Sequence, residues 1–426
     1  MVHGIRNGIE SEQSFTTERK QNNEVDEIST TRTQTEKENE VGKQTDLLQM
    51  PEVEYSRFFK IIDSSIQGLR EYRLITTALD LEVFEALKDP LPAYALAEKL
   101  GCDPLLMPYF CEALYRIGLL DRFEEGTSEN LESKEAKIEL QNQDKDQIDS
   151  RVESKAQSIN NQGKTGDHKY LISELTATYL LKNSPFPQKH YLAERLRNVE
   201  LWTRLPQIMR EGPEIFDKGP FFGEVIQCMA ESAKCGTLQE TIRVVLENVD
   251  FTKIRKMLDL GGGHGLYAIA FAKQNRDLKV FVFDLPPVTE KTKQFIEKYD
   301  ASNVNVIPGD FFKDEIGKNY DLIFSSFNPG GKVPSLVPKI TEALNPGGIF
   351  ITRQVPEEKM ESNPLFNLDW NLWTFEDVKK GSTSYTFENS VPFSEYIEML
   401  ENYGLKVLNV LDMKDGSKTV FAQKMT

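Results

Sequence analysis

A glycine-rich turn between two apolar segments constrains the fold of this chain more than any other feature. Residues Met257–Gly265 read Met-Leu-Asp-Leu-Gly-Gly-Gly-His-Gly, and a second apolar segment ends at Asp284, 25 positions beyond Asp259. An alanine-rich helical segment lies between them. A strand, a glycine turn, a helix and a strand ending in an acid form a nucleotide-binding βαβ unit. Its glycines let the backbone approach a ligand, its helix N-terminus offers N–H groups, and its second acid can bind ribose hydroxyls.

The details of the turn favour one class of nucleotide. Gly263–Ala268 satisfies the dinucleotide pattern G-x-G-x-x-A, but in that pattern the first glycine normally follows the strand directly. Here the chain instead completes Asp-x-Gly-x-Gly-x-Gly, with Asp259, Gly261, Gly263 and Gly265. At this point it resembles the class I S-adenosylmethionine-dependent methyltransferases, whose first motif this is. A carboxylate at the strand end suits the cationic amino-acid moiety of that cofactor and would repel a pyrophosphate.

Three later segments extend the resemblance. Val304–Phe312 predicts a short strand that ends in Gly309-Asp310-Phe311. In the family such an aspartate accepts a hydrogen bond from the adenine amino group, and an adjacent apolar side chain covers the ring. Tyr320–Ser326 predicts a fourth strand. Leu344–Ile351 predicts a helix end, a turn and a fifth strand, with Gly347-Gly348 as the helix stop.

The order of these segments predicts an α/β fold. We expect a doubly wound, mostly parallel, seven-stranded Rossmann-like methyltransferase sheet, with S-adenosyl-L-methionine at the carboxyl ends of its strands. Cysteine and histidine are too sparse to indicate a metal site. The resemblance implies the following cofactor-binding residues: Asp259, Gly261, Gly263, Gly265, Asp284, Leu285, Gly309, Asp310, Phe311 and Ser325.

Composition indicates a protein with two folded parts. The chain has 426 residues and a mean hydropathy of -0.46, and two polar stretches, 1–48 and 124–168, are predicted to be disordered. The second is interpreted as a solvated insertion, with a regulatory docking segment as the alternative. No apolar run is long enough for a bilayer, no signal peptide is evident, and the four cysteines form no CxxC pair. We therefore expect a cytoplasmic protein with reduced thiols.

A helical block precedes the glycine turn. Its segments predict helix, turn, helix and hairpin, the order of a winged helix, with the acidic insertion in the wing. The predicted recognition helix, which is the third helix of the block, contains one base, Arg116, and one acid, Glu112. Phosphate contacts need several basic residues, and the net charge is -16, so we expect no nucleic acid partner. The segments are Tyr72–Leu87, Pro92–Leu100 stopped by Gly101, Pro104–Ile117 capped by Asp103, Gly118–Phe123 and Tyr170–Thr176.

The block and the glycine-rich domain together resemble one branch of the family, the small-molecule O-methyltransferases that include caffeate and hydroxyindole O-methyltransferases. The likeness covers roughly residues 70–123 and 169–424, including Val391–Lys406, where the family has a helix, a glycine turn and the last antiparallel strands. It implies a homodimer whose partner subunit helps to close the substrate pocket. The implied domains are a tail (1–48), a winged-helix dimerisation domain (49–184) carrying the insertion, linker helices (185–246) and the cofactor-binding methyltransferase domain (247–426).

The chain departs from the family at the catalytic base. A phenol or alcohol acceptor needs its proton removed, which the family does with a histidine in a His-Asp-Trp segment after the fourth strand. Here that stretch, Ser325–Lys332, contains neither histidine nor carboxylate. His264 is expected to fill a position in the cofactor turn, and His190 to serve at the surface or in packing of a linker helix. Lys332 would act only if burial lowered its pKa; the default interpretation is a solvated loop lysine.

Three explanations of the missing base remain open. The acceptor is already a nucleophile, an O, S, N or C atom of a small molecule or a protein side chain; or substrate binding brings a base from elsewhere; or the chain is a non-catalytic cofactor-binding scaffold or winged-helix interaction protein. The pocket is expected to be lined by residues 185–235 and 355–385. Within that region Phe222, Met229, Trp370 and Trp373 either face a ligand or simply pack.

Overall fold

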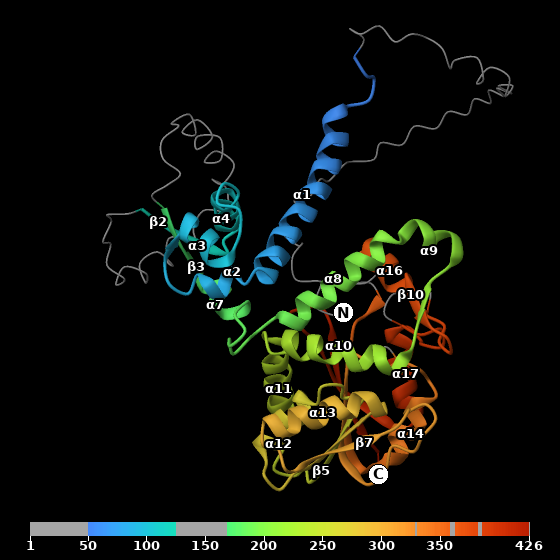
Figure 1. Cartoon of the computed structure of the whole chain (residues 1–426). Coiled ribbons are helices and arrows are strands. Elements are labelled where there is room, and N and C mark those ends of the chain that lie inside the picture. Colours follow the sequence, from blue (N-terminus) through green and yellow to red (C-terminus); the bar gives the residue numbers. More distant parts are fainter. Residues whose placement is uncertain (1–49, 125–167, 329, 358–362, 382–385, 426) are drawn as a thin grey trace, which may run out of the picture.

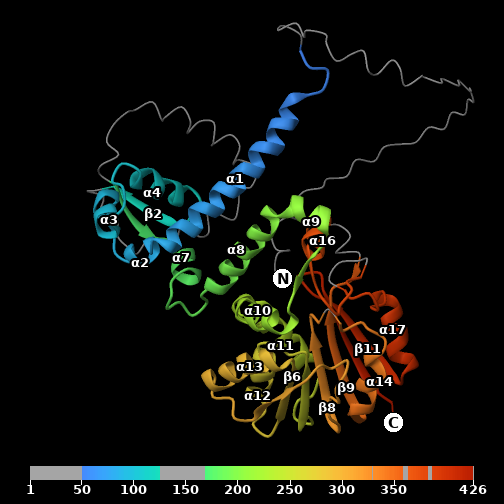
Figure 2. The same cartoon turned by 45° about the vertical axis from the view of Figure 1, so that its right-hand side comes forward.

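The computed structural model describes residues 50–124, 168–328, 330–357, 363–381 and 386–425. The described chain forms an N-terminal block, linking helices and a C-terminal α/β unit (Figures 1 and 2). The disorder predicted for residues 1–48 falls outside this part of the chain. The predicted insertion, 124–168, includes two described residues, Glu124 and His168, one at each end. These two residues pair with each other as strand residues, so the predicted bounds are wrong by one residue at each end.

The N-terminal block begins with a long helix, α1 (Tyr55–Asp80), which starts well before the apolar pattern at Tyr72. The predicted segment Tyr72–Leu87 is not one continuous helix. Glu82 has a φ of 57°, a left-handed conformation that interrupts α-helical hydrogen bonding. A separate short helix, α2 (Val83–Ala86), follows it.

The rest of the block follows the predicted order. Gly101, with a φ of 66°, ends the first of the two paired helices as expected. Asp103 Oδ1 accepts hydrogen bonds from the amides of Leu105 and Leu106, in a turn that precedes the second helix. That helix therefore starts at Met107, later than predicted. The elements are β1 (Leu91–Pro92), α3 (Ala93–Leu100), α4 (Met107–Arg116), the antiparallel hairpin β2 (Leu120–Glu124) and β3 (His168–Ile172), and α7 (Glu174–Tyr179).

Linking helices connect this block to the α/β unit. They are α8 (Lys189–Thr203), α9 (Leu205–Glu211), α10 (Lys218–Ala233) and α11 (Thr237–Asn248), with the short strand β4 (Glu214–Phe216) between α9 and α10. β4 pairs in parallel with β10 (Trp373–Phe375), far along the sequence. Around that pair, aromatic and aliphatic side chains from α8, α10 and β10 form a buried cluster.

A seven-stranded sheet forms the centre of the α/β unit, in the order β11-β12-β9-β8-β5-β6-β7. The five strands from β9 to β7 are parallel, and β12 and β11 are antiparallel additions at one edge. The fold class predicted from the sequence is confirmed. The strands are β5 (Lys256–Leu260), β6 (Lys279–Asp284), β7 (Val304–Pro308), β8 (Tyr320–Ser326), β9 (Leu344–Gln354), β11 (Leu405–Asp412) and β12 (Lys418–Lys424).

Helices cover both faces of this sheet because its central strands are apolar on both sides. One core packs the sheet against α10 and α11 and against α12 (Leu266–Gln274) and α13 (Pro286–Lys298). The other packs it against α14 (Leu336–Ala343) and α17 (Phe393–Asn402). Figure 2 shows the two layers on either side of the strands. Helix α16 (Pro364–Asn371) packs with the linking helices instead.

One local prediction in this unit is wrong. Gly347-Gly348 was predicted to stop a helix, but α14 already ends at Ala343 and both glycines lie in β9. The pairing of β8 with β9 is irregular beside them, between Tyr320 and Leu322. Gly347 has a φ of 74°, so the glycine serves a strand irregularity rather than a helix end.

Candidate functional site

The glycine turn lies where the strand order of the parallel sheet reverses, between β5 and its neighbours β6 and β8. In open α/β sheets, ligands bind outside the carboxyl ends of the strands at such a switch point. Gly261, Gly263 and Gly265 have φ values of 68°, 56° and 68°. These left-handed values are readily adopted only by glycine.

The turn also leaves no room for side chains. A Cβ atom on Gly261 would lie 2.4 Å from Nδ2 of Asn328, and one on Gly262 would lie 2.6 Å from Cγ of Asp259. A Cβ atom on Gly265 would lie 2.6 Å from Cγ2 of Thr292. The backbone is therefore packed against its neighbours, and its N–H groups lie at the start of α12.

Asp259 lies directly beneath this turn. Its side chain is 1% exposed, and within the described residues neither carboxylate oxygen has a hydrogen-bond partner of ordinary geometry. Burial, together with the neighbouring charge of Asp284, raises the pKa of Asp259 to about 8, and the backbone N–H of Ala268 opposes this only in part. A buried carboxyl group without partners is costly, and a cationic group beside it would relieve that cost.

Asp284 holds the turn from the adjacent strand. Its Oδ2 accepts a 2.9 Å hydrogen bond from the N–H of Gly263, and its Oδ1 accepts a 2.8 Å bond from the N–H of Leu285. Burial raises the pKa of Asp284 to about 6, although both bonds lower it. From α13, the hydroxyl of Thr292 donates to the carbonyl of Gly263 over 2.7 Å. The predicted residues of the first two strands are thus brought together.

The third acid lies at the end of the next strand. Gly309 packs so closely that a Cβ atom would lie 2.6 Å from Cζ of Phe283. Asp310 is partly exposed, and its Oδ1 accepts a 3.0 Å bond from the N–H of Phe312. Cε1 of Phe311 would lie 3.5 Å from a Cβ atom on Gly261, so this ring reaches the turn. Asp259 and Asp284 therefore lie at the carboxyl ends of β5 and β6, and Asp310 lies two residues beyond the end of the next parallel strand, β7.

A cavity adjoins the turn on the side of Asp259. Besides the turn itself, three regions line it: Met229, Ser232 and Ala233 of α10, His264 just before α12 with Tyr267 in its first turn, and Ser326 at the end of β8 with Phe327 directly after it. Ser326 lines it rather than the predicted Ser325, which is 3% exposed, because successive side chains of a strand point to opposite faces. Sequence reasoning missed Tyr267 and Phe327, although a strand end marks Phe327.

The three candidate bases have different surroundings. His264 lines the cavity, is 5% exposed, and accepts a 3.0 Å hydrogen bond at Nδ1 from the N–H of Leu266, so it caps the start of α12. His190 lies outside this cavity. Its Nδ1 is 2.6 Å from Oε1 of Glu231, and it lines a separate cavity of about 490 Å³ between α1–α2 and α7–α8.

The default interpretation of Lys332 as a solvated lysine is wrong. Its side chain is 3% exposed and pairs with Oε1 of Glu357. The other oxygen of Glu357 accepts from the N–H of Phe393, at the start of α17. Asn328 Oδ1 accepts from the N–H of Gly330, in the same loop. Asn328 is thus bound within the loop after β8, and Lys332 is linked through Glu357 to the start of α17.

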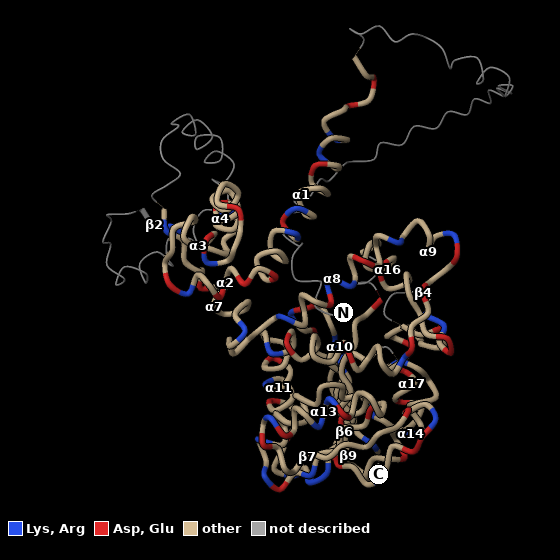
Figure 3. The backbone as a smooth tube through the Cα atoms, viewed as in Figure 1, with Lys and Arg blue, Asp and Glu red and all other residues tan. Residues whose placement is uncertain are grey.

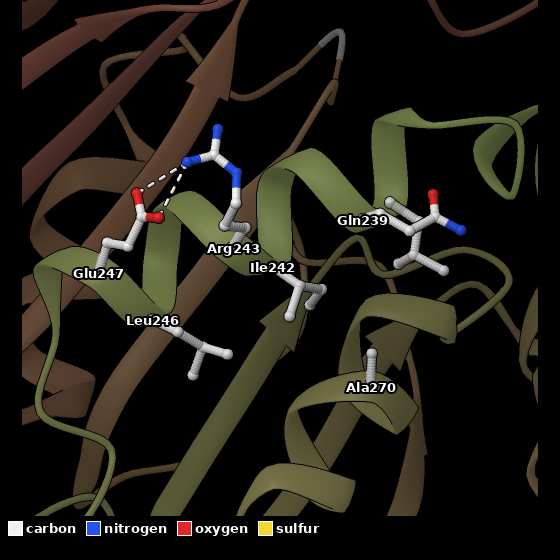
Figure 4. Close-up of a pocket in the computed structure, with 7 residues that line it drawn as sticks. Gln239, Ile242, Arg243, Leu246, Glu247 and Ala270 are labelled. Atoms are coloured by element: carbon white, nitrogen blue, oxygen red, sulfur yellow. Dashed lines mark hydrogen bonds and ion pairs between the residues drawn. The ribbon is translucent and has the colours of Figure 1, made fainter.

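Other parts of the predicted pocket region are packing residues. Trp370 and Trp373 are each 3% exposed and stack edge to face, with ring centroids 5.1 Å apart. Phe222 packs against Phe375, whereas Met229 lines the cavity. A further hollow, of about 540 Å³, lies between α11 and α12 and includes none of the predicted site residues (Figure 4).

Charge pairs, metal-ligand groups and helix apolarity among the described residues bear on nucleic-acid, metal and membrane binding. On α4, Glu112 pairs with Arg116 and with Arg122 at 2.9 and 2.8 Å, which leaves no basic face. Figure 3 shows acidic and basic positions interspersed along the described chain. Among the described residues, no group of His, Cys, Asp and Glu could hold a metal ion, and no helix has the length and apolarity to cross a membrane.

Comparison with known proteins agrees with the geometry. The sequence model of the O-methyltransferase domain matches residues 225–367. An uncharacterized protein of Methanocaldococcus jannaschii is 36% identical over 373 residues, covering 87% of this chain and 90% of that protein. Acetylserotonin O-methyltransferase of Rattus norvegicus is 25% identical, covering 74% of this chain and 68% of that protein.

Solved structures share the fold. Human N-acetylserotonin methyltransferase, solved in complex with S-adenosylmethionine, has a TM-score of 0.58 at 19% identity, covering 88% of this chain and 100% of that chain. A Nostoc punctiforme protein described as a putative O-methyltransferase has a TM-score of 0.61 at 20% identity, covering 87% and 100%. Together with the sequence matches, these findings show that the chain belongs to the S-adenosylmethionine-dependent O-methyltransferase family.

Proposed function

We propose that the turn from Asp259 to Gly265 holds S-adenosylmethionine, with Asp284 at its ribose and Asp310 at its adenine. Asp259 faces the amino-acid end of the cofactor, Leu285 and Phe311 cover its apolar parts, and Ser326, at the end of β8, borders the sulfonium. The bound cofactor supplies an electrophilic methyl group. The protein's part is to orient an acceptor in line with that methyl group and to exclude water.

One observation carries this assignment. Asp259 is buried, and among the described residues neither of its carboxylate oxygens has a hydrogen-bond partner of ordinary geometry; it lies directly below a turn in which side chains would collide with their neighbours. A carboxyl group in that state destabilises the ligand-free protein. Such a cost is typical of functional sites, where a bound ligand offsets it. A cation bound in the adjoining cavity would keep Asp259 ionised, and S-adenosylmethionine carries positive charge at both its sulfonium and its ammonium group.

The acceptor is proposed to be a small molecule whose nucleophilic oxygen ionises readily. Several relatives are named for transfer to oxygen, among them acetylserotonin O-methyltransferase and the tetracenomycin polyketide synthesis 8-O-methyl transferase of Streptomyces glaucescens, whereas a relative matched over a shorter stretch is named for transfer to carbon. In this chain, the loop after β8, where the family has its histidine, offers Lys332, which is paired with Glu357 from the segment after β9. An acceptor with a low pKa needs no base.

Two measurements test the proposal. Isothermal titration should show S-adenosylmethionine binding to the full chain. Transfer of labelled methyl groups should then be measured for substituted phenols of graded pKa at one pH. We expect the rates to follow the ionised fraction of each phenol. Efficient transfer to unactivated alcohols would contradict the proposed absence of a base, and absence of cofactor binding would contradict the assignment of the site.

The winged-helix block is proposed to form a homodimer through α1. Phe58, Ile62, Ile66 and Leu69 lie on one side of this helix at helical spacing and are 61%, 42%, 41% and 54% exposed. The helix projects away from the other elements in Figures 1 and 2. Monomeric soluble proteins rarely expose such a continuous apolar surface, and a second copy of α1 would cover it.

The mass of the full chain in solution tests this association. Ile62→Glu together with Ile66→Glu should convert a dimer to a monomer in sedimentation experiments, because each introduces a charge into the interface. Ser64→Glu, on the opposite side of the helix, is the matched control and should leave the dimer intact. A wild-type chain that sediments as a monomer at micromolar concentration would contradict the proposal.

A further inference from the structure

Phe327 has an unusual backbone conformation at the wall of the cofactor cavity. Its φ is 53°, its side chain is 9% exposed, and it lines the cavity together with Asp259 and the glycine turn. A bulky residue adopts this left-handed conformation only where the surrounding structure holds it. Its N–H donates to the carbonyl of Arg353 over 2.9 Å, so the neighbouring strand β9 provides part of that support.

The side chain of Arg353 supports the ring of Phe327 as well. It is 0% exposed, and its Cζ atom lies 4.8 Å from the centroid of that ring. A guanidinium at this distance from an aromatic face is attracted by the ring quadrupole, more strongly when both groups are shielded from water. The same residue therefore contacts Phe327 through its main chain and through its side chain.

The guanidinium is fixed by partners that come from distant parts of the chain. Its Nε donates to Oγ of Ser417 over 2.8 Å, and one terminal nitrogen donates to Oδ2 of Asp415 over 2.8 Å. The other terminal nitrogen donates to Oγ1 of Thr241, and Oε2 of Glu240 lies 3.7 Å from the nitrogen that contacts Asp415. Helix α11 and the turn between β11 and β12 thus hold the arginine in place.

The charge of Arg353 is balanced inside this network. Burial raises the pKa of Asp415, but the charge of Arg353 and the hydrogen bonds from Ser417 and Arg353 outweigh it, so the net pKa lies below its ordinary value. Asp415 is therefore ionised at neutral pH. Each of the three guanidinium nitrogens makes a hydrogen bond, and these bonds together with the ion pair hold the group in position beneath Phe327.

We propose that Arg353 is a positioning residue for the cofactor cavity, which it shapes by holding the ring of Phe327 without touching the cofactor. The inference rests on the proposed cofactor site. It predicts that cofactor affinity depends on the contact between arginine and ring, in addition to any effect of Arg353 on folding. A residue with a purely structural role would change the melting temperature and leave the affinity unchanged.

The test compares cofactor affinity with stability in single and double variants. Isothermal titration with S-adenosylmethionine and thermal melting are measured for the wild type, Arg353→Lys, Phe327→Leu and the double variant. Arg353→Lys keeps the charge and removes the planar group, and Phe327→Leu removes the ring. We expect each single change to raise the dissociation constant roughly fivefold to tenfold. The dissociation constant of the double variant should lie within about twofold of that of the single variant that binds the cofactor more weakly.

Two control variants separate positioning from stability. Arg243→Lys makes the same substitution at an exposed pair with Glu247 on α11, drawn in Figure 4, and should change neither quantity. Leu400→Ala removes a side chain that is 0% exposed in the core on the other face of the sheet. It should lower the melting temperature and leave the dissociation constant unchanged.

The outcomes are distinguishable. If Arg353→Lys behaves like Leu400→Ala, or if the two single effects multiply in the double variant, the proposal is wrong. If Arg353→Lys does not fold, Phe327→Tyr and Phe327→Leu decide, because the first keeps a ring over the guanidinium; equal affinity of these two variants would overturn the proposal. A wild type that melts normally but binds no S-adenosylmethionine would instead contradict the proposed function on which this inference rests.

Discussion

Asp284 accepts a 2.9 Å hydrogen bond from the N–H of Gly263, so the acid at the end of β6 holds the glycine turn that follows the neighbouring strand β5. This bond joins two motifs that are separated in the sequence. Removing this carboxylate would leave the N–H of Gly263 without its side-chain acceptor, which links cofactor affinity to the shape of the backbone.

Replacing Asp284 should greatly weaken cofactor binding. Asp284→Ala removes the acceptor for Gly263 and the proposed acceptor for the ribose hydroxyls. Hydrogen bonds to charged groups contribute about 1.5 to 3 kcal/mol each, so we expect the dissociation constant for S-adenosylmethionine to rise at least about tenfold in isothermal titration. Asp277→Ala, at an exposed position in the same βαβ unit, is the control. Equal affinity of the two variants would remove the ribose assignment.

A methyl group on Gly265 should destabilise the turn. Gly265→Ala places its Cβ atom 2.6 Å from Thr292 and keeps a φ of 68°, so we expect a loss of about 2 kcal/mol or more in denaturant unfolding. Gly68→Ala is the matched control, because nothing lies within 4 Å of its Cβ position in α1. That change should stabilise the helix by about 0.5 to 1 kcal/mol. Similar losses for both variants would argue against steric packing of the turn.

The stability of the cofactor-free protein should fall with rising pH because of Asp259. Its folded-state pKa of about 8 lies above its ordinary value of 3.8, so between these values the folded chain keeps a proton that the unfolded chain has released. The free energy of unfolding therefore decreases as the pH rises through this window, and the loss is complete above pH 8.

Asp259→Asn removes this dependence, since an amide does not ionise. The melting temperature of the variant relative to wild type should increase from pH 5 to pH 9, by at least about 2 °C, while cofactor affinity falls. At pH 7 the wild type should release protons when it binds S-adenosylmethionine, as measured in buffers of different ionisation enthalpy. The absence of proton release in the wild type would show that Asp259 does not face the cation.

Removing only one charge of the buried ion pair between Lys332 and Glu357 should lower the free energy of unfolding more than removing both charges. Lys332→Met leaves Glu357 without its counter-charge, and we expect a loss of about 3 to 5 kcal/mol in denaturant unfolding. Adding Glu357→Gln should restore part of that stability, because the uncompensated charge is gone while an acceptor remains for the N–H of Phe393. A double variant less stable than Lys332→Met would contradict the ion pair.

The sequence was sufficient for the parts of the fold that depend on local pattern. The strands β5, β6 and β7 were recognised because their apolar runs end at or just before a glycine or an acid, and β8 has the predicted bounds, Tyr320–Ser326. Local pattern failed where the backbone conformation depended on neighbours. Glu82 interrupts the first helix without a glycine or proline to mark the break, and Gly347 serves a strand irregularity that resembles a helix stop.

The sequence by itself determined the βαβ unit and the three acids at adjacent strand ends, because glycine spacing and strand periodicity are encoded within short segments. Only the tertiary structure decided the surroundings of those acids and of the candidate bases. Burial of Asp259, the pairing of Lys332 with Glu357 and the contact of Arg353 with Phe327 join strands, helices and turns that are distant in the chain. Such contacts follow from how the elements pack, which no local pattern of residues specifies.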